Sequence, residues 1–171
     1  MTVYVALLRA INVGGTGKLA MKDLAALCTG LGFSNVRTYI QSGNVVFESR
    51  KAEEAVRKAF EAALTEVLGK PADVAVRMAA EMAMVAVSNP FMGAPAAKVG
   101  IAFFNRPLPK SASREIVIRG EEVVGIGPRV VYIYFPDGMG RSKLDLPKHW
   151  GPATIRNMNT VARLTAMAVA G

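Results

Sequence analysis

The sequence predicts an α+β protein with mainly antiparallel sheets and a chain divided into two related halves. Over the first 80 residues, apolar β-rich runs and amphipathic helices follow one another in the order β-α-β-β-α-β. This order is the split βαβ, or ferredoxin-like, motif. The second half repeats the pattern less regularly. We therefore expect two ferredoxin-like halves, at residues 1–80 and 81–171, that form one compact protein.

The elements of the first half follow from hydrophobic periodicity. Residues 2–9 are β-rich and almost wholly apolar, which indicates a central buried strand. Apolar residues recur every three or four positions over 21–31 and 52–68, which predicts two helices, with Cys28 buried on the first. The segment Ser42-Gly43-Asn44 predicts a hairpin with antiparallel strands at about 35–40 and 44–48. A last strand is expected at 73–78, with Arg77 on a solvent-facing side.

The elements of the second half are predicted from shorter patterns. We expect a short helix near 80–87, a Pro/Gly/Ala linker, a strand at 98–105 and a turn or short helix at 107–113. Glycines then divide a three-strand meander at 115–119, 121–126 and 129–135. A glycine-rich basic loop follows, and a final helix is expected from about 153 to 168.

Composition excludes several classes of protein. With 51% hydrophobic residues the chain can bury a core, and one cysteine and one histidine exclude a disulfide, a cysteine zinc cluster and the usual histidine metal sites within one chain. We expect no metal and no cofactor. No signal peptide or membrane span is evident, which predicts a soluble cytoplasmic protein without membrane partners. The net charge of +8 is concentrated in residues 98–171, which carry +6.

The loop after the first strand has features of a phosphate-binding turn. It is not a Walker loop, because Leu19 replaces the hydroxyl residue after Lys18. A dinucleotide fingerprint fits at residues 15–20, but the segment 37–41 lacks the acidic residue that would hold a ribose. A flexible glycine turn is the alternative. Asn12, Gly14, Gly15 and Lys18 nevertheless offer amides and a cation before a helix, which suits an anion.

Two further interpretations have weak sequence support. An RNA-recognition surface would need two aromatic residues on the third strand, and residues 44–47 supply only Phe47. A general-base role for His149 would need an acidic partner, for which Asp145 is the candidate by sequence; a solvent-facing histidine is the preferred interpretation.

The richest polar cluster lies late in the chain. The segment "GMGRSKLDLP" places Arg141, Ser142 and Lys143 on a glycine-opened loop. In "TIRNMNTVARL" a helical period would put Arg156 and Asn159 on one face, with Thr160 and Arg163. Arginine clamps carboxylates and phosphates, and asparagine orients them. An ordinary solvated helix face is the alternative.

Four ordered segments resemble those of one known family: "LLRAINVGG", "RTYIQSGNVVFES", "GRSKLDLP" and "TIRNMNTVARL". Together they resemble the bacterial Domain-of-Unknown-Function-1697 family over essentially the whole chain. The resemblance implies an α+β protein with two ferredoxin-like halves, and it assigns no activity and no catalytic residue. The family pattern has glycine at Ala10 and tryptophan at Met158, so this chain lacks an indole on its last segment.

The leading hypothesis is a protein that binds a phosphate- or nucleotide-like small molecule in a polar cleft between the halves. The alternatives are a sequence-nonspecific nucleic-acid-binding module that uses the basic second half, and a scaffold domain. We expect the first loop and the 42–44 hairpin to lie at opposite ends of their sheet, so the hairpin residues are the looser members of the site. The candidate ligand-binding residues are Asn12, Gly14, Gly15, Lys18, Gln41, Asn44, Arg141, Ser142, Lys143, Arg156 and Asn159. The sequence assigns no reaction, substrate or oligomeric state.

Overall fold

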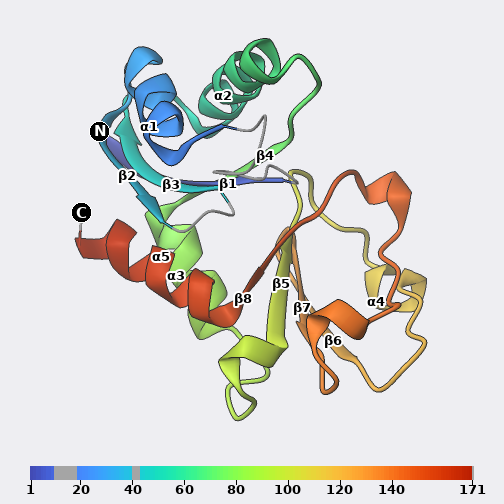
Figure 1. Cartoon of the computed structure of the whole chain (residues 1–171). Helices are drawn as coiled ribbons and strands as arrows, with labels where there is room; N and C mark the ends of the chain where they lie inside the picture. Colours follow the sequence, from blue (N-terminus) through green and yellow to red (C-terminus); the bar gives the residue numbers. More distant parts are fainter. Residues whose placement is uncertain (10–18, 40–42, 171) are drawn as a thin grey trace. The chain divides into compact units, whose positions relative to one another are not determined.

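The structure is a computed structural model that describes residues 1–9, 19–39 and 43–170 (Figure 1). The chain forms two compact units. Unit 1 comprises Met1–Ala83 together with Leu164–Gly171, and unit 2 comprises Met84–Arg163. Among the described residues, no helix has the length and apolar character needed to cross a membrane.

Unit 1 contains the predicted β-α-β-β-α-β order (Figure 1). The strands form one sheet in the order β2-β3-β1-β4, and every neighbouring pair is antiparallel. This is the strand order of a ferredoxin-like sheet. The elements are β1 (Thr2–Leu8), α1 (Met21–Gly30), β2 (Ser34–Tyr39), β3 (Asn44–Ser49), α2 (Glu53–Leu68), β4 (Val74–Met78) and α3 (Ala79–Val87), of which α3 continues into unit 2.

The hairpin prediction is confirmed, because β2 and β3 pair antiparallel. This pairing removes the parallel βαβ unit that the dinucleotide interpretation requires. The expectation that the hairpin and the end of β1 lie at opposite ends of the sheet is wrong. The backbone N–H of Leu8 donates to the carbonyl of Gly43 at 2.9 Å, and Leu7 pairs with Asn44. Since β3 runs antiparallel to β1, β3 begins where β1 ends.

The core of unit 1 lies between the sheet and the helices α1 and α2 (Figure 1). Phe33 and Phe47 stack with ring centroids 4.3 Å apart, and Phe60 from α2 meets the edge of this pair. Cys28 from α1 packs in the same cluster and is fully buried, as predicted. The apolar stripes of both helices therefore face the sheet, as their periodicity requires.

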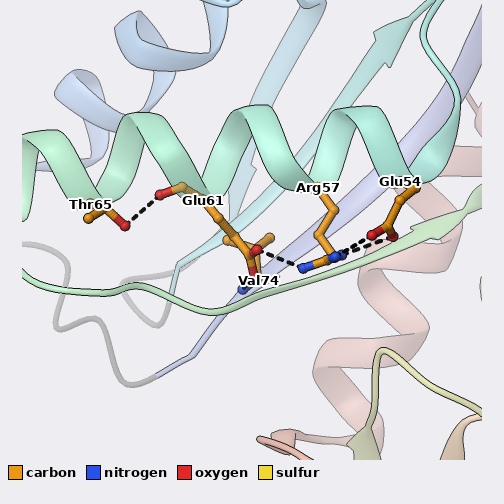
Figure 2. A network of polar contacts seen from close by, with 5 residues as sticks. All are labelled: Glu54, Arg57, Glu61, Thr65 and Val74. Carbon is orange, nitrogen blue, oxygen red and sulfur yellow. Dashed lines mark hydrogen bonds and ion pairs between the residues drawn. The ribbon is translucent and has the colours of Figure 1, made fainter.

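A polar network ties α2 to the start of β4 (Figure 2). Arg57 forms ion pairs with Glu54 and Glu61, one turn before and one turn after it on the helix. The second oxygen of Glu61 accepts a hydrogen bond from the backbone N–H of Val74 at 3.0 Å. One carboxylate thus joins the helix to the strand.

The last strand of unit 1 departs from its predicted pattern. Arg77 was expected on a solvent-facing side, but its side chain is fully buried and Met78 is exposed. The guanidinium lies 3.3 Å from the carboxylate of Glu81, one turn into α3, and donates to the carbonyl of Val76. A buried charge needs such partners, and the alternation of β4 alone does not reveal them.

Unit 2 repeats the strand arrangement of unit 1. Its sheet has the order β6-β7-β5-β8, again with antiparallel neighbours, so β5 and β8 correspond to β1 and β4. A helix of only four residues follows β5, and no α-helix joins β7 to β8. The elements are β5 (Val99–Phe103), α4 (Ala112–Glu115), β6 (Val123–Gly127), β7 (Val130–Tyr134), β8 (Thr154–Asn157) and α5 (Met158–Ala170), of which α5 ends in unit 1.

Two predictions for the second half are wrong. Residues 115–119 form no strand; Val117 makes only an isolated bridge with Asp145. The final helix does not begin at 153, because Thr154–Asn157 is strand β8, which pairs with β5. Arg156 therefore lies on a strand and Asn159 on the helix after it, so the helical face that was expected to join them is absent.

Candidate functional site

The loop between β7 and β8, residues 135–153, carries the late polar cluster. It contains two single-turn 3₁₀ helices, Met139–Arg141 and Lys148–Trp150, where unit 1 has the long helix α2. Prolines and the left-handed glycines Gly138 and Gly151, both with φ of 88°, prevent a continuous helix. We call this segment the β7–β8 loop.

The apolar residues of the β7–β8 loop cover one face of the second sheet. Trp150 is buried and packs edge-to-face on Phe104, with ring centroids 5.6 Å apart. Met139, Leu144 and Leu146 pack against the same cluster. Because these anchors hold the loop to the sheet, its intervening polar residues have defined positions.

A pocket of about 240 Å³ lies between the start of the β7–β8 loop and the segment before β6. We call it the basic pocket. Both segments belong to unit 2. Its charged and hydroxyl side chains are Arg119, Glu122, Asp137, Arg141, Ser142 and Lys143. Three of these side chains are cationic and two are carboxylates, so the lining favours an anion while offering acceptors to a donor group.

Ser142 and Glu122 form the polar floor of the basic pocket. The Ser142 hydroxyl donates to Oε1 of Glu122 at 2.8 Å and accepts from the backbone N–H of Leu144 at 3.2 Å. Backbone hydrogen bonds, first that of Glu122 itself, and the Ser142 hydroxyl lower the pKa of the Glu122 carboxyl. Oε2 of Glu122 is buried and accepts no hydrogen bond of good geometry within the described chain, although the Gly120 amide is near the carboxylate.

Arg119 holds the far side of the basic pocket in place. Its Nη1 lies 2.6 Å from Oδ2 of Asp145 and also donates to the carbonyl of Lys143 at 2.8 Å. The guanidinium therefore fixes the backbone that carries Lys143. Arg119 thereby positions Lys143 in the basic pocket.

Arg141 and Lys143 are the available cations of the basic pocket. Both side chains are exposed, and neither has a hydrogen bond or ion pair with another described residue. Exposed cations keep their solvation until a ligand arrives, so they can attract an anion without first breaking an internal pair.

The predicted site residues fall into three groups. Arg141, Ser142 and Lys143 line the basic pocket together. Five lie outside the described residues: Asn12, Gly14, Gly15, Lys18 and Gln41. Asn44, Arg156 and Asn159 are not among the residues that line the basic pocket, and the cleft between the halves stays a prediction.

Those three residues have different surroundings. Asn44 is fully buried and its Nδ2 donates to the carbonyl of Tyr39 at 2.9 Å, which closes the hairpin. Arg156 follows Ile155 on β8; Ile155 lines a cavity with the β7–β8 loop, and alternation places Arg156 on the other face of the sheet. Burial lowers the pKa of Arg156 to about 10. Asn159 is exposed on α5.

His149 has an acidic partner that the sequence did not indicate. Its Nε2 lies 2.9 Å from Oε1 of Glu115, at the end of α4, whereas Asp145 pairs with Arg119. The imidazole is 71% exposed, in agreement with the prediction of a solvent-facing histidine. Residues 115 and 149 are too far apart in sequence for any local pattern to relate them.

In the described part of the chain, no three His, Cys, Asp or Glu side chains are grouped so that they could hold a metal ion. The basic pocket offers hydrogen-bond donors, three cations and two carboxylates.

The fold defines an α+β protein made of two related units with the same antiparallel strand order. A family model described as a protein of unknown function, DUF1697, matches residues 1–132. The chain belongs to this family. The match ends before the β7–β8 loop.

The fold is shared with solved structures of other proteins, among them one that matches nearly the whole chain. The conserved bacterial protein SP0830 from Streptococcus pneumoniae superposes with a TM-score of 0.80 at 23% sequence identity, covering 99% of each chain. At this identity the likeness concerns the fold. No curated protein matches the sequence.

Proposed function

We propose that the basic pocket binds a small molecule that carries a phosphate-like anion, with a nucleotide or sugar phosphate as the best-fitting class. The observation that supports this most strongly is the placement of Arg141 and Lys143 beside the Ser142–Glu122 pair, since the side chains of both cations make no hydrogen bond or ion pair within the described chain. Two cations match the charge of a phosphate group better than that of a single carboxylate.

Glu122 adds a second element of selectivity. A carboxylate with a lowered pKa stays ionised at neutral pH and accepts hydrogen bonds. An anion that lacked donors would be repelled by it. A phosphorylated sugar or nucleoside has hydroxyl donors a short distance from its phosphate, so one ligand can satisfy both sides of the basic pocket.

A thermal-shift and calorimetry experiment tests this proposal. The probes are ribose 5-phosphate and adenosine monophosphate, with ribose and adenosine as uncharged controls. The phosphorylated probes should bind and raise the melting temperature, since a ligand that binds only the folded state stabilises it. Equal binding of the uncharged controls, or no binding of either phosphorylated probe, would contradict the proposal.

Matched variants locate the binding. Arg141→Ala and Lys143→Ala should each weaken binding by about tenfold or more, the loss expected for a charge-assisted contact. Lys148→Ala is the control, because Lys148 is exposed on the same loop and does not line the basic pocket. Lys18→Ala tests the predicted contribution of the first loop. Unchanged binding in both Arg141→Ala and Lys143→Ala would show that the ligand binds outside the basic pocket.

Nucleic-acid binding is the second candidate function, and the charge distribution supports it. Unit 2 carries eleven basic and five acidic residues, a net charge of +6, whereas the whole chain carries +8. Binding of a short single-stranded RNA would weaken steeply as salt rises, because bound counterions are released. Binding of ribose 5-phosphate at two cations would depend on salt much less. Fluorescence anisotropy over a salt series separates the two functions.

A further inference from the structure

A second pocket in unit 2 lies apart from the basic pocket and has a different character. It has a volume of about 310 Å³ and is formed by the segment after β5, the end of α4 and the end of the β7–β8 loop. We call it the tryptophan pocket. Four of the seven residues that line it are apolar: Pro107, Leu108, Pro109 and Trp150. The others are Arg106, Glu115 and His149.

Glu115 organises the polar wall of the tryptophan pocket. Its carboxylate accepts a hydrogen bond from the Ser111 hydroxyl and pairs with His149 at 2.9 Å. The Ser111 hydrogen bond first, and then the charge of His149, lower the pKa of the Glu115 carboxyl. Because Ser111 and His149 both hold the carboxylate, the three residues do not form a serine–histidine relay. This wall is a fixed surface and does not supply a nucleophile.

Trp150 contributes a donor that the described chain leaves without a well-formed hydrogen bond. The side chain is only 6% exposed, and its Nε1 is buried with no partner of good geometry. The indole N–H lies on the side of Glu115, close enough to help lower the pKa of that carboxyl. A buried N–H without an acceptor is costly. Because this nitrogen is buried beside Glu115, it belongs to the polar wall, and Trp150 adds apolar surface to the lining of the tryptophan pocket.

Arg106 contributes an exposed cation to the lining of the tryptophan pocket. Its Nη2 lies over the backbone of Gly151, so close that a Cβ there would be 3.1 Å from it. Gly151 also has a φ of 88°, which favours glycine. The guanidinium has no hydrogen bond or ion pair with another described residue. Gly151 thus leaves room for a guanidinium whose donors remain available.

We propose that the tryptophan pocket is a second ligand site, which takes a small hydrophobic carboxylate with an aromatic or branched aliphatic body. The body packs on the prolines, Leu108 and the indole. The carboxylate accepts from Arg106, whose planar fork suits two parallel hydrogen bonds. A phosphate dianion is disfavoured relative to a carboxylate, because a single guanidinium compensates only one of its two charges and the Glu115 carboxylate repels both.

The single tryptophan of the chain makes the test specific. Fluorescence of Trp150 is followed during titration with benzoate, with benzamide as its uncharged isostere and inorganic phosphate as the second control. Benzoate should change the emission saturably, with a Kd of about 1 mM or tighter. At the same concentrations, benzamide and inorganic phosphate should not change the emission saturably and should not displace benzoate. No saturable change with benzoate, or equal binding of benzamide, would overturn the proposal.

Two variants test the role of the guanidinium. Arg106→Ala should weaken benzoate binding by about tenfold or more, because it removes a charge-assisted contact. Arg114→Ala is the matched control: Arg114 is exposed on α4 and does not line the tryptophan pocket, so binding should be unchanged. Equal weakening in both variants would mean that only the net charge matters and would overturn the proposal. Binding of ribose 5-phosphate at the basic pocket should survive Arg106→Ala.

Discussion

The packing around Gly100 leaves no room for a side chain larger than hydrogen. It lies in β5, and a Cβ at this position would approach Cε2 of Phe135 to 2.8 Å and Cε of Met139 to 3.2 Å. Both neighbours belong to the β7–β8 loop. Gly100→Ala should therefore destabilise the protein by about 1–3 kcal/mol, as overpacking of a filled core does, although alanine is normally the better residue in a strand. Chemical denaturation measures this change.

The control for this variant is Gly93→Ala. A Cβ at Gly93 would have open space around it, and the backbone needs no positive φ there. Its stability should stay within about 0.5 kcal/mol of the parent. If Gly100→Ala were equally neutral, the loop would not be held against β5 as described.

The thiol of Cys28 should be unreactive in the folded protein. The side chain is fully buried, and burial raises the pKa of the thiol to about 12. The thiolate is the reactive species, and at pH 8 only about one thiol in ten thousand would be ionised. Iodoacetamide should label Cys28 slowly in buffer and rapidly in denaturant. Fast labelling of the native protein would show that α1 opens readily from the sheet.

At the scale of single residues, the sequence predicts which side chains can bind a ligand better than it predicts which of them lie together. Arg141, Ser142 and Lys143 are adjacent in sequence, so their grouping could be predicted from the glycines around them. Glu122 belongs to the same site through a hydrogen bond to Ser142, and no local pattern joins residues twenty positions apart. The partner of His149 was mistaken for the same reason. Polar sites are built from long-range contacts, which periodicity does not encode.

Helix α2 supplies a prediction at the scale of an element. Glu61 pairs with Arg57 and accepts from the Val74 backbone N–H at the start of β4 (Figure 2). Glu61→Ala should cost about 1–3 kcal/mol, because it removes the carboxylate that accepts from this partly buried N–H. Glu66→Ala, at an exposed position of the same helix, should cost much less. Similar losses in the two variants would mean that the contact with Val74 contributes little.

The elements that the sequence predicted well are those with a strong local period. Helix α2 and the β2–β3 hairpin have bounds within a few residues of the expected ones. Strand β8 was missed, because Thr154–Asn157 is short and continues directly into α5, so its residues also fit a helical period. Only the pairing with β5 makes them a strand. Where local propensity allowed both a helix and a strand, the pairing with another strand determined the secondary structure.

At the scale of the whole molecule, one strand order is used twice with different crossovers. Unit 1 covers its sheet with α1 and α2, and unit 2 uses α4 and the β7–β8 loop. A regular helix satisfies its own backbone and presents a repeating face, whereas an irregular loop can aim neighbouring side chains and amides at one point. Both pockets described above involve the β7–β8 loop. The sequence predicted this repeat of the fold and a glycine-rich basic loop after β7, but not strand β8, which follows the loop.

The path of the chain gives a prediction for the molecule as a whole. Residues 164–171 belong to unit 1, although unit 2 separates them from the rest of it in sequence. Nη1 of Arg37, on β2, donates to the carbonyl of Met167 at 2.8 Å, and Ala168 is only 3% exposed. A chain that ends at Arg163 loses these contacts and leaves Arg37, whose Nη2 is buried, with fewer acceptors.

This truncation should therefore weaken unit 1 selectively. Hydrogen exchange should accelerate first in β2 and β3, while the amides of β5 and β7 keep most of their protection, because local opening follows the contacts that are lost. A chain that ends at Ala168 is the control: it retains the Arg37 contact and removes Val169, which is 67% exposed. Equal acceleration in both sheets would show that the two units open together, and unchanged exchange in β2 would show that the C-terminal residues do not support unit 1.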